Sequence, residues 1–363
     1  MEVVVIRSAE EFSSWERPWK DFMENVDHSE IFNTWEWLEA YVTHMMGPEQ
    51  ELFVIMLIDN NRCVAAAPLC IVTRKIKWMK VRSLQFIVSG TGETNNFYIH
   101  RHAHYMKVLQ EMFNVLNRHR EQWDWIDLHG IHSFHPVTSL IGQACGHQFE
   151  VFSRTRSAAP YVDLDRFHED KMAQKRIKAI ERKERKLRSD HETRLEIHVP
   201  IDRRAWESLT DMHKQRWSQS LFRDERMMRF FDDVIEKLHA TDSAYVSYIE
   251  INGSIASAML TFSHKSKIYL YITSFSGQYM EYGVGLILLN QVMQHYLQSG
   301  FREIDLMSGT QEYKFFWSDT VRLNSHIRLI NKQGGRLLKA YTLLQVNKDH
   351  IKALLPGKGS TAG

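Results

Sequence analysis

The residues most suggestive of chemistry in this sequence are a tyrosine and a lysine, Tyr313 and Lys314. They lie just past a short apolar segment, residues 302–306, whose pattern predicts a strand. Ligands of α/β sheets commonly bind at the carboxyl ends of strands, so both side chains are candidates for a functional site. Aromatic neighbours can instead anchor one short helix in the core, and we favour that role for Trp317. A lysine among aromatic residues seldom serves packing alone, which makes Lys314 the stronger candidate.

A glycine-containing loop, residues 277–285, precedes this region and leads into an expected helix over 286–298. Gly283 and Gly285 would let the backbone approach a ligand closely, and free N–H groups at the start of a helix favour an anion. A pyrophosphate fits such a loop without a P-loop lysine. An ordinary turn between a strand and a helix is the alternative interpretation. The functional interpretation predicts an anion site formed by the main-chain amides from Gly283 to Leu286.

Several familiar catalytic motifs are absent from the sequence. It contains no GxxxxGK[ST], GxSxG or HExxH pattern. Gly283-Val-Gly285 begins like a dinucleotide-binding fingerprint, but Leu288 stands where the third glycine or alanine should be. Two groups of histidines have spacings that suit a metal: His100, His102 and His104, and His129, His132 and His135. No HxxxH helix or cysteine pair accompanies them, so we expect no metal site.

The composition indicates an ordinary globular chain of about two domains, at roughly 150 residues per domain. Of 363 residues, 44% are apolar, and 46 basic against 44 acidic residues give a net charge of +2. This balance gives no global sign of nucleic-acid binding. The longest apolar run, residues 63–72, is too short for a membrane helix of about 20 residues, and no leader pattern is visible at the start. With three cysteines and no CxxC motif, we expect a soluble protein of the reducing cytoplasm.

Strand and helix patterns recur in the same order in the two halves of the chain. The first half predicts helices over 10–25, 33–46 and 105–118 and strands over 52–58, 63–72, 82–88, 95–99 and 123–128. The second half predicts strands over 244–250, 255–262, 267–273, 302–306 and 321–330, with the helix 286–298 between them. Ile251-Asn252-Gly253, between the first two of these strands, predicts a hairpin turn of the type that needs positive φ. Ile126-Asp127-Leu128 in the first half matches Ile304-Asp305-Leu306 in the second. The shared order predicts a duplicated α/β unit.

A strongly basic segment, residues 171–188, separates the two halves. It contains nine basic and two acidic side chains and keeps a narrow apolar stripe at helical spacing, which predicts an amphipathic helix. Such a helix can join two domains with its charges in solvent. Its alternative role is to bind an anionic ligand such as a phosphorylated cofactor or a nucleic acid.

The order of strands, glycine loop and helix, followed by Asp305-x-x-x-Gly309-x-x-x-Tyr313-Lys314-x-x-Trp317, resembles the GNAT acyltransferase superfamily. More narrowly, the chain resembles the tandem-GNAT proteins grouped as CelD/BcsL-like acetyltransferases, which are relatives of the FemABX peptidyltransferases. The resemblance extends over about residues 20–335. Further matching segments are Phe32 with Trp35 and Trp37, residues 212–217, Phe230-Phe231, and residues 255–258. The loop Glu281-Tyr-Gly-Val-Gly285 lacks the Ser-Pro-Gly common in this subgroup but keeps two glycines before the helix.

The resemblance implies an α/β (α+β) fold of two tandem GNAT-like domains, each a mixed twisted sheet flanked by helices. We expect an N-terminal GNAT-like domain over residues 1–165 and a basic linking helix over 166–195. A C-terminal GNAT domain with the donor site would follow over 196–350, and a flexible tail over 351–363. The first half has no Gly-x-Gly directly before its helix at 105–118, so one competent donor site is implied, in the second half.

The resemblance also implies an acyl-CoA-dependent N-acyltransferase, in which an amine attacks a bound thioester. Acetyl-CoA would be the donor, with no metal, and the acceptor would be an amine of a sugar, amino acid or peptide, in polysaccharide or cell-envelope biosynthesis. The implied cofactor-binding residues are Tyr282, Gly283, Val284, Gly285 and Leu286. The implied catalytic residues are Lys314 at the acceptor or the developing charge, Tyr313 as general acid, and Asp305 or Glu312 as proton relay. The implied substrate-binding residues are His213, Arg216, Trp217 and Trp35.

Two alternatives remain open from the sequence. A FemABX-like transferase would use aminoacyl-tRNA, with the basic segment 171–188 contacting phosphates, although FemABX proteins usually carry a longer coiled-coil arm. If the donor is not aminoacyl-tRNA, we expect no nucleic acid as a partner. The other alternative is a non-catalytic binding protein of an exopolysaccharide pathway. The acceptor, the acyl chain length and the oligomeric state are not determined by the sequence.

Overall fold

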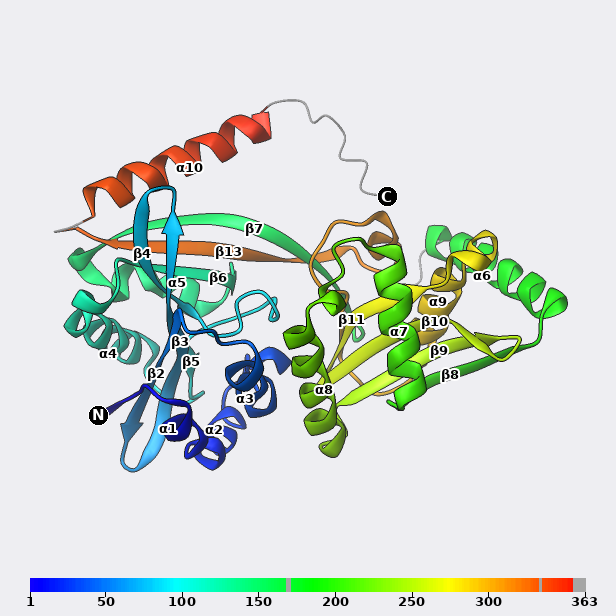
Figure 1. Cartoon of the computed structure of the whole chain (residues 1–363), viewed down its shortest axis with the longest axis horizontal. Coiled ribbons are helices and arrows are strands. Elements are labelled where there is room, and N and C mark those ends of the chain that lie inside the picture. Colours follow the sequence, from blue (N-terminus) through cyan, green and yellow to red (C-terminus); the bar gives the residue numbers. More distant parts are fainter. Residues whose placement is uncertain (168–170, 333–334, 355–363) are drawn as a thin grey trace.

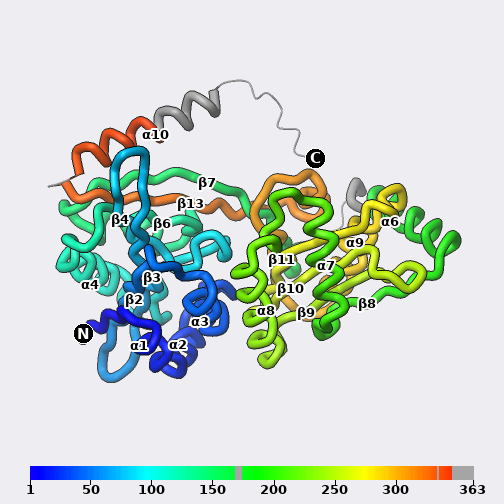
Figure 2. Tube along the Cα trace, in the orientation of Figure 1, coloured from blue at the N-terminus to red at the C-terminus, as the bar shows by residue number. Residues whose placement is uncertain are grey.

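The computed structural model describes residues 1–167, 171–332 and 335–354. Two lobes lie side by side (Figures 1 and 2) and share one 13-stranded sheet. The first lobe, here the N-lobe, contains β1 (Glu2–Ile6), α1 (Ala9–Ser13), α2 (Glu16–Met23), α3 (Trp35–His44), β2 (Gln50–Asp59), β3 (Arg62–Ile76), β4 (Met79–Phe86), β5 (Tyr98–Ile99), α4 (Tyr105–Arg118), β6 (Trp125–His132) and α5 (Pro136–Ala144). The second, the C-lobe, contains α6 (Lys171–Asp190), β8 (Thr193–Pro200), α7 (Arg203–Arg216), α8 (Glu225–Ala240), β9 (Ala244–Ile251), β10 (Ser254–His264), β11 (Lys267–Phe275), α9 (Val284–Tyr296) and β12 (Glu303–Asp305).

Two long strands, β7 (Phe149–Asp163) and β13 (Thr320–Asn331), join the lobes. β7 follows the N-lobe in sequence, but its end pairs with β12 of the C-lobe, Tyr161–Asp163 against Asp305–Glu303. β13 follows the C-lobe in sequence, but it lies between β6 and β7 in the sheet. Each half therefore inserts a strand next to the strands of the other half. The domain boundaries expected from the sequence remain a prediction.

The predicted fold class is confirmed: a large mixed sheet is flanked by helices, with the two lobes built from the same order of elements. The helix expected at 105–118 is α4. The hairpin turn expected at residues 251–253 has positive φ at Asn252 (50°) and Gly253 (81°), as such turns require. The helix expected over 10–25 is divided into α1 and α2, and Pro18 lies in the first turn of α2, where its missing N–H costs no helical bond.

Some elements have no counterpart among the expected ones. These are β1, α5, β7, α7, α8, β8 and α10 (Arg336–Leu354). The tail expected from residue 351 begins inside α10, and residues 355–363 lie outside the described residues. None of the helices described is both long enough and apolar enough to cross a membrane.

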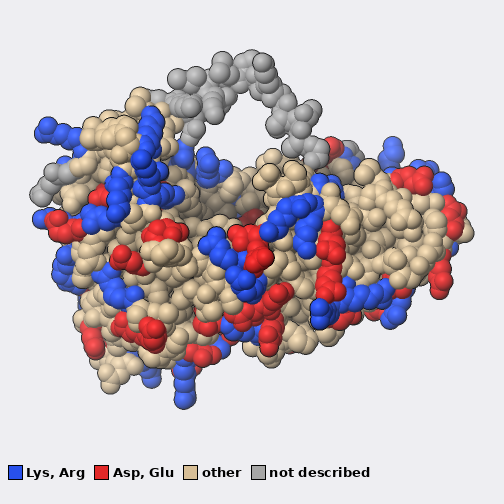
Figure 3. All heavy atoms as spheres, viewed as in Figure 1, with Lys and Arg blue, Asp and Glu red and all other residues tan. Residues whose placement is uncertain are grey.

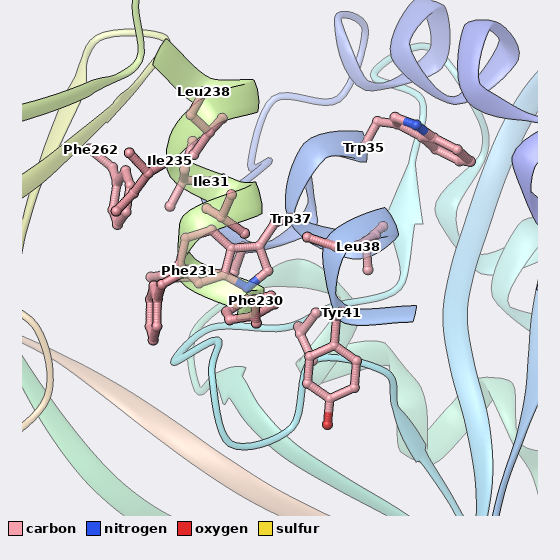
Figure 4. Packing of buried hydrophobic residues seen from close by; sticks show 14 of the residues in the cluster. Ile31, Trp35, Trp37, Leu38, Tyr41, Phe230, Phe231, Ile235, Leu238 and Phe262 are labelled. Carbon is pink, nitrogen blue, oxygen red and sulfur yellow. The ribbon is translucent and has the colours of Figure 1, made fainter. Parts of the chain in front are cut away.

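Aromatic packing fixes the contact between the lobes. Trp37 of α3 is fully buried, and its ring lies 5.6 Å from that of Phe230 and 6.4 Å from that of Phe231, both in α8. Phe262 of β10 lies 5.4 Å from the same indole (Figure 4). The cluster contains side chains of both lobes, so the lobes share one hydrophobic core.

Candidate active site

The site begins where two parallel strands separate. β11 and β12 pair only from Lys267–Glu303 to Tyr269–Asp305, after which β12 ends and β11 continues to Phe275. A register shift opposite Leu260 and Thr261 bends β11 at this point. Past Tyr269, no described strand pairs with this edge of β11, so its backbone groups face a gap rather than a neighbouring strand.

A cleft of about 550 Å³ occupies this gap, a volume within the range of small-molecule sites. It is lined by apolar side chains of the sheet and of α9, including Met259, Leu270, Leu286, Leu289 and Leu306. Polar and aromatic groups lie at its wall: Arg216, Trp217, Thr273, Gln311 and Tyr313. Gly283 and Gly285 also line the cleft, so the glycine loop identified in the sequence opens onto it.

Both glycines of the loop are required by geometry. Gly283 has φ 68°, a left-handed conformation that other residues rarely adopt, and it follows the short helix η5 (Gly277–Tyr282) as the N-cap of α9. At Gly285, an added Cβ would lie 2.7 Å from Cδ1 of Phe275. The backbone of α9 therefore lies so close to β11 that only a glycine fits at position 285 without a shift of its neighbours.

Only part of the predicted amide group is free. Gly283 donates its N–H to the carbonyl of Met280 (3.0 Å), and Leu286 donates to the carbonyl of Gly283 (2.9 Å), because these bonds close the turn that starts α9. Within the described residues, the N–H groups of Val284 and Gly285 have no backbone acceptor. The amides of Gly283 and Leu286 are thus already used, which contradicts their part in the expected anion site, and the amides of Val284 and Gly285 remain candidates for it.

Tyr282 and Val284 do not line the cleft with their side chains. The hydroxyl of Tyr282 donates to Oδ2 of Asp190 at the end of α6 (2.9 Å), and the side chain of Val284 is fully buried in the C-lobe core. Their side chains hold the loop against α6 and the sheet. The sequence pattern could not separate this role from ligand contact because adjacent residues of a turn face different sides.

The basic helix predicted over 171–188 is α6, and it packs against α9 through Ile177, Ile180 and Leu187. This packing places Lys183 beside the glycine loop: its Nζ is 3.6 Å from the position that a Cβ on Gly283 would take. The sequence placed Lys183 in a charged helix but gave no sign that it would approach the loop, since the two segments are about 100 residues apart.

Three predicted residues lie together at the mouth of the cleft: Arg216, Trp217 and Tyr313. The guanidinium of Arg216, at the end of α7, lies over the ring of Phe275 at 3.9 Å and over that of Trp217 at 5.2 Å. Burial raises the pKa of Tyr313, and the nearby charge of Arg216 opposes this shift. The phenol is therefore protonated at neutral pH and can donate a proton or a hydrogen bond.

Lys314 does not line the cleft. Its side chain is 4% exposed, and its ammonium donates to the carbonyls of Met307 (3.0 Å) and Ser308 (2.7 Å). Met307 has φ 63°, an unfavourable value for this residue, so the lysine secures a strained loop. Burial lowers the pKa of Lys314. The predicted contact with an acceptor is corrected to the support of residues 307–308, because both carbonyls take up its donors.

The two predicted proton relays have contrasting surroundings. Asp305 is buried, accepts the N–H of Met307 (2.8 Å) and pairs with Arg322 (3.1 Å), while burial raises its pKa to about 6. It belongs to a buried charge network rather than to the cleft wall. Glu312 is exposed at the start of the short helix η6 (Glu312–Phe316) and has no ion-pair partner among the described residues. Neither lies on the cleft.

His213 and Trp35 also lie away from the cleft. His213 shares a hydrogen bond between Nδ1 and the hydroxyl of Ser220 (2.7 Å), which ties α7 to the following turn. Trp35 is 6% exposed and stacks on Phe12 at 4.5 Å, in the N-lobe core. Both residues were expected to bind substrate, and both instead serve local packing.

One residue near the site was missed. Glu93, in the N-lobe loop after β4, accepts the N–H of Ser308 with its carboxylate, and burial raises its pKa. Its backbone is held closely: a Cβ on Gly130 would lie 2.5 Å from the carbonyl oxygen of Glu93. Glu93 and Lys314 thus hold residues 307–308 from opposite lobes. In the sequence, Gly90 and Gly92 mark this loop, but they give no indication that the carboxylate of Glu93 has a role.

The described residues contain a cluster of metal-ligating types at Asp127, His129 and His326, with ligand atoms within 4.8 Å of one another. Arg328 donates to both carboxylate oxygens of Asp127, from Nε at 2.9 Å and Nη2 at 3.2 Å. A cation would have to displace this guanidinium. The group is better described as an internally paired polar network between β6 and β13.

Comparison with known proteins relates part of the chain to one family. Residues 174–315 match the model of the acetyltransferase (GNAT) domain family. A comparison with curated proteins gave no match. The predicted resemblance to the GNAT superfamily is therefore confirmed for residues 174–315, the region that carries most of the cleft and the glycine loop.

Solved structures extend the fold likeness to both lobes. FemX superposes with a TM-score of 0.56 at 11% identity, covering 90% of this chain and 97% of that one. L-PGS from Bacillus licheniformis gives 0.52 at 12%, covering 91% and 96%. The C-terminal domain of a putative lysylphosphatidylglycerol synthetase from Agrobacterium fabrum gives 0.55 at 10%, covering 92% and 96%. The two-lobed fold is thus shared with FemX.

Proposed function

We propose that the protein is an N-acyltransferase that takes its acyl group from an acyl-CoA, such as acetyl-CoA, and transfers it to an amine. The observation that carries this proposal is the cleft between β11 and β12, which opens at Gly283 and Gly285 at the start of α9. A largely apolar cleft that ends at free main-chain amides suits a donor with a long neutral arm and a charged diphosphate.

The diphosphate end of the donor fits the start of α9. The free N–H groups of Val284 and Gly285 and the positive end of the 13-residue helix favour an anion there. Lys183 adds a cation beside Gly283. Gly285 has no side chain that could cover its own amide, and an added Cβ there would meet the ring of Phe275.

The arm of the donor fits the edge of β11. Backbone groups past Tyr269 pair with no strand of the described residues on this side and can bond to amides of an extended ligand, as an added strand would. Leu270, Leu289 and Leu306 give the cleft an apolar wall for this arm. The thioester supplies an activated acyl carbon, and the protein contributes mainly by holding the two reactants together.

Tyr313 is our candidate for the general acid. Its phenol lines the cleft and stays protonated, so it can give a proton to a departing thiolate. Arg216 and Trp217 lie at the same mouth and are candidates for binding the acceptor. An amine of a sugar, amino acid or peptide is the proposed acceptor, in polysaccharide or cell-envelope biosynthesis, and a cytoplasmic location is part of this proposal.

Binding of CoA tests the donor. We expect CoA and acetyl-CoA to raise the unfolding temperature in a concentration-dependent manner. Lys183→Ala should weaken this binding several-fold, because it removes a cation next to the diphosphate, whereas Lys178→Ala, exposed on the same helix, should not. Equal binding by both variants would contradict the placement of the diphosphate, and absence of any CoA binding would contradict the proposal itself.

A second donor, aminoacyl-tRNA, is favoured by the basic helix α6 and by the likeness to FemX. Neutralising Arg182, Lys183, Arg185 and Lys186 would then abolish a salt-sensitive tRNA complex. Tight tRNA binding without any response to CoA would decide for this donor. A protein that binds neither donor would be a non-catalytic binding protein.

A further inference from the structure

We infer that the β3–β4 hairpin is a membrane-docking element that binds the surface of an anionic lipid bilayer. Strands β3 and β4 pair up to Ile76 and Met79, so Lys77 and Trp78 form a two-residue turn at the tip. Trp78 is 70% exposed there, one of the most exposed large apolar side chains among the described residues. This surface lies in the N-lobe and is separate from the proposed acyl-CoA cleft.

The turn is built from unusual residues for its geometry. Lys77 has φ 54°, a left-handed value that two-residue hairpin turns usually assign to glycine, asparagine or aspartate. A lysine and a tryptophan stand there instead, although they gain no burial: both are exposed. Local stability would favour Gly or Asn at Lys77, and burial within this chain does not account for Trp78, which supports a role for the tip in contact with a partner.

The charge around Trp78 has one sign. From Thr73 to Arg82 the sequence is Thr-Arg-Lys-Ile-Lys-Trp-Met-Lys-Val-Arg, with five cations and no acidic residue. Arg74 and Arg82 are paired with Asp127 and Asp124 at the base of the hairpin. The lysines nearer the tip, Lys75, Lys77 and Lys80, are exposed and have no ion-pair partner among the described residues. Blue spheres gather at this end of the N-lobe in Figure 3.

Helix α10 extends this surface. Nζ of Lys77 lies 6.0 Å from the ring of Tyr341, which places α10 beside the tip of the hairpin (Figure 1). Leu343 and Leu344 of α10 are 48% and 67% exposed, and residues 336–345 contain no acidic side chain. Apolar groups therefore accompany the lysines on two adjacent elements.

A bilayer surface matches this combination better than a nucleic acid does. Tryptophan prefers the boundary between headgroups and acyl chains, where its ring is apolar and its N–H stays hydrated. Lysines next to it gain from the negative potential of anionic headgroups. A nucleic acid would also bind the lysines through its phosphates, but it would leave the neighbouring leucines of α10 in water.

Vesicle co-sedimentation of the full chain tests the inference. We expect binding to vesicles of phosphatidylcholine mixed with phosphatidylglycerol in equal parts, little binding to pure phosphatidylcholine, and loss of binding as salt is raised. Trp78→Ala should reduce the partition coefficient about tenfold, the effect of withdrawing one immersed aromatic side chain. Lys75→Glu with Lys80→Glu should reduce it more, at about fivefold for each cation removed.

Matched controls separate a specific surface from general charge. Lys175→Glu with Lys178→Glu makes the same change in net charge on exposed positions of α6, and Phe134→Ala removes another exposed aromatic ring, 74% exposed. Both should bind like the unaltered chain. Equal loss in the α6 double variant would overturn the inference in favour of general electrostatic attraction.

Depth of insertion gives a second readout that does not depend on affinity. Lipids brominated on the acyl chain quench a tryptophan that enters the bilayer, so the quenching should disappear in Trp78→Phe while vesicle binding persists. Because the residue is exposed, the variant should keep the unfolding temperature of the unaltered chain. Unchanged quenching in Trp78→Phe, or lysine-dependent binding of duplex RNA with none to vesicles, would overturn the inference.

Discussion

Tyr313 and Lys314 are adjacent in η6 but differ in what they contact. The phenol lines the cleft beside Arg216, whereas the ammonium is buried against two carbonyls of the preceding loop. The sequence identified both residues, since a polar pair after a strand end is a visible pattern. The sequence could not show that Tyr313 lines the cleft while Lys314 supports the loop. That difference depends on how Glu93 of one lobe and Ser308 of the other come together in the fold.

Replacement of Tyr313 separates binding from chemistry. If the phenol donates a proton in the reaction, Tyr313→Phe should lower kcat by about 100-fold, the contribution typical of general acids. CoA binding should be unchanged, because the ring that lines the cleft is retained. Steady-state kinetics with calorimetric titration of CoA measure both. Loss of CoA affinity with an unaltered kcat would show that the hydroxyl binds the donor instead.

Replacement of Lys314 reports on loop support. Lys314→Met keeps the buried aliphatic stem but leaves the carbonyls of Met307 and Ser308 without this donor, so we expect a loss of about 2 kcal/mol in the free energy of unfolding. Urea denaturation measures this. If Lys314→Met has an unaltered free energy of unfolding but no turnover, the support role is wrong and Lys314 acts in catalysis, as the sequence suggested.

At the scale of elements, the sequence predicts local structure well where the signal is local. Helix α4 and the hairpin at Asn252-Gly253 follow directly from periodicity and turn chemistry. The strand β7 was missed because its residues alternate weakly and include Pro160, and its length reflects pairing with β13 and β12. The amphipathic helices α7 and α8 were also missed, although each carries an acidic N-cap, Asp202 and Asp224.

The junction of η5 and α9 yields the sharpest prediction for the donor. Gly285→Ala places a Cβ 2.7 Å from the ring of Phe275, so either the ring or the start of α9 must move. We expect CoA affinity to fall at least tenfold with a change of about 1–3 kcal/mol in stability. Gly277→Ala is the matched control, since a Cβ there meets nothing within 4 Å. Equal affinities of the two variants would mean that the donor does not use this backbone.

At the scale of the whole molecule, the contact between lobes contains histidines that burial keeps neutral. The pKa values of His132, His135 and His264 are each lowered to about 4 by burial. Lysine side chains, including Lys265 and Lys267, oppose protonation of His264, and Glu30 favours it. Nε2 of His264 shares a hydrogen bond with the hydroxyl of Ser29, across the lobes (2.9 Å).

These shifts predict acid sensitivity. Each histidine binds a proton more readily when unfolded than when folded, so stability is complete above pH 6.5 and falls as the pH drops from about 6.5 to 4. For His264 the loss is up to about 3 kcal/mol. His264→Gln should flatten this dependence, as measured by denaturant unfolding at several pH values. A slope identical to that of the unaltered chain would mean that other groups cause the acid sensitivity.

The place of β13 between β6 and β7 has a consequence for synthesis of the chain. When a ribosome has released the N-lobe, the slot between β6 and β7 is still empty, because the strand that fills it is translated only after the entire C-lobe. The nascent chain therefore carries two open sheet edges until Asn331 emerges, and neither lobe can complete its folding as an independent unit.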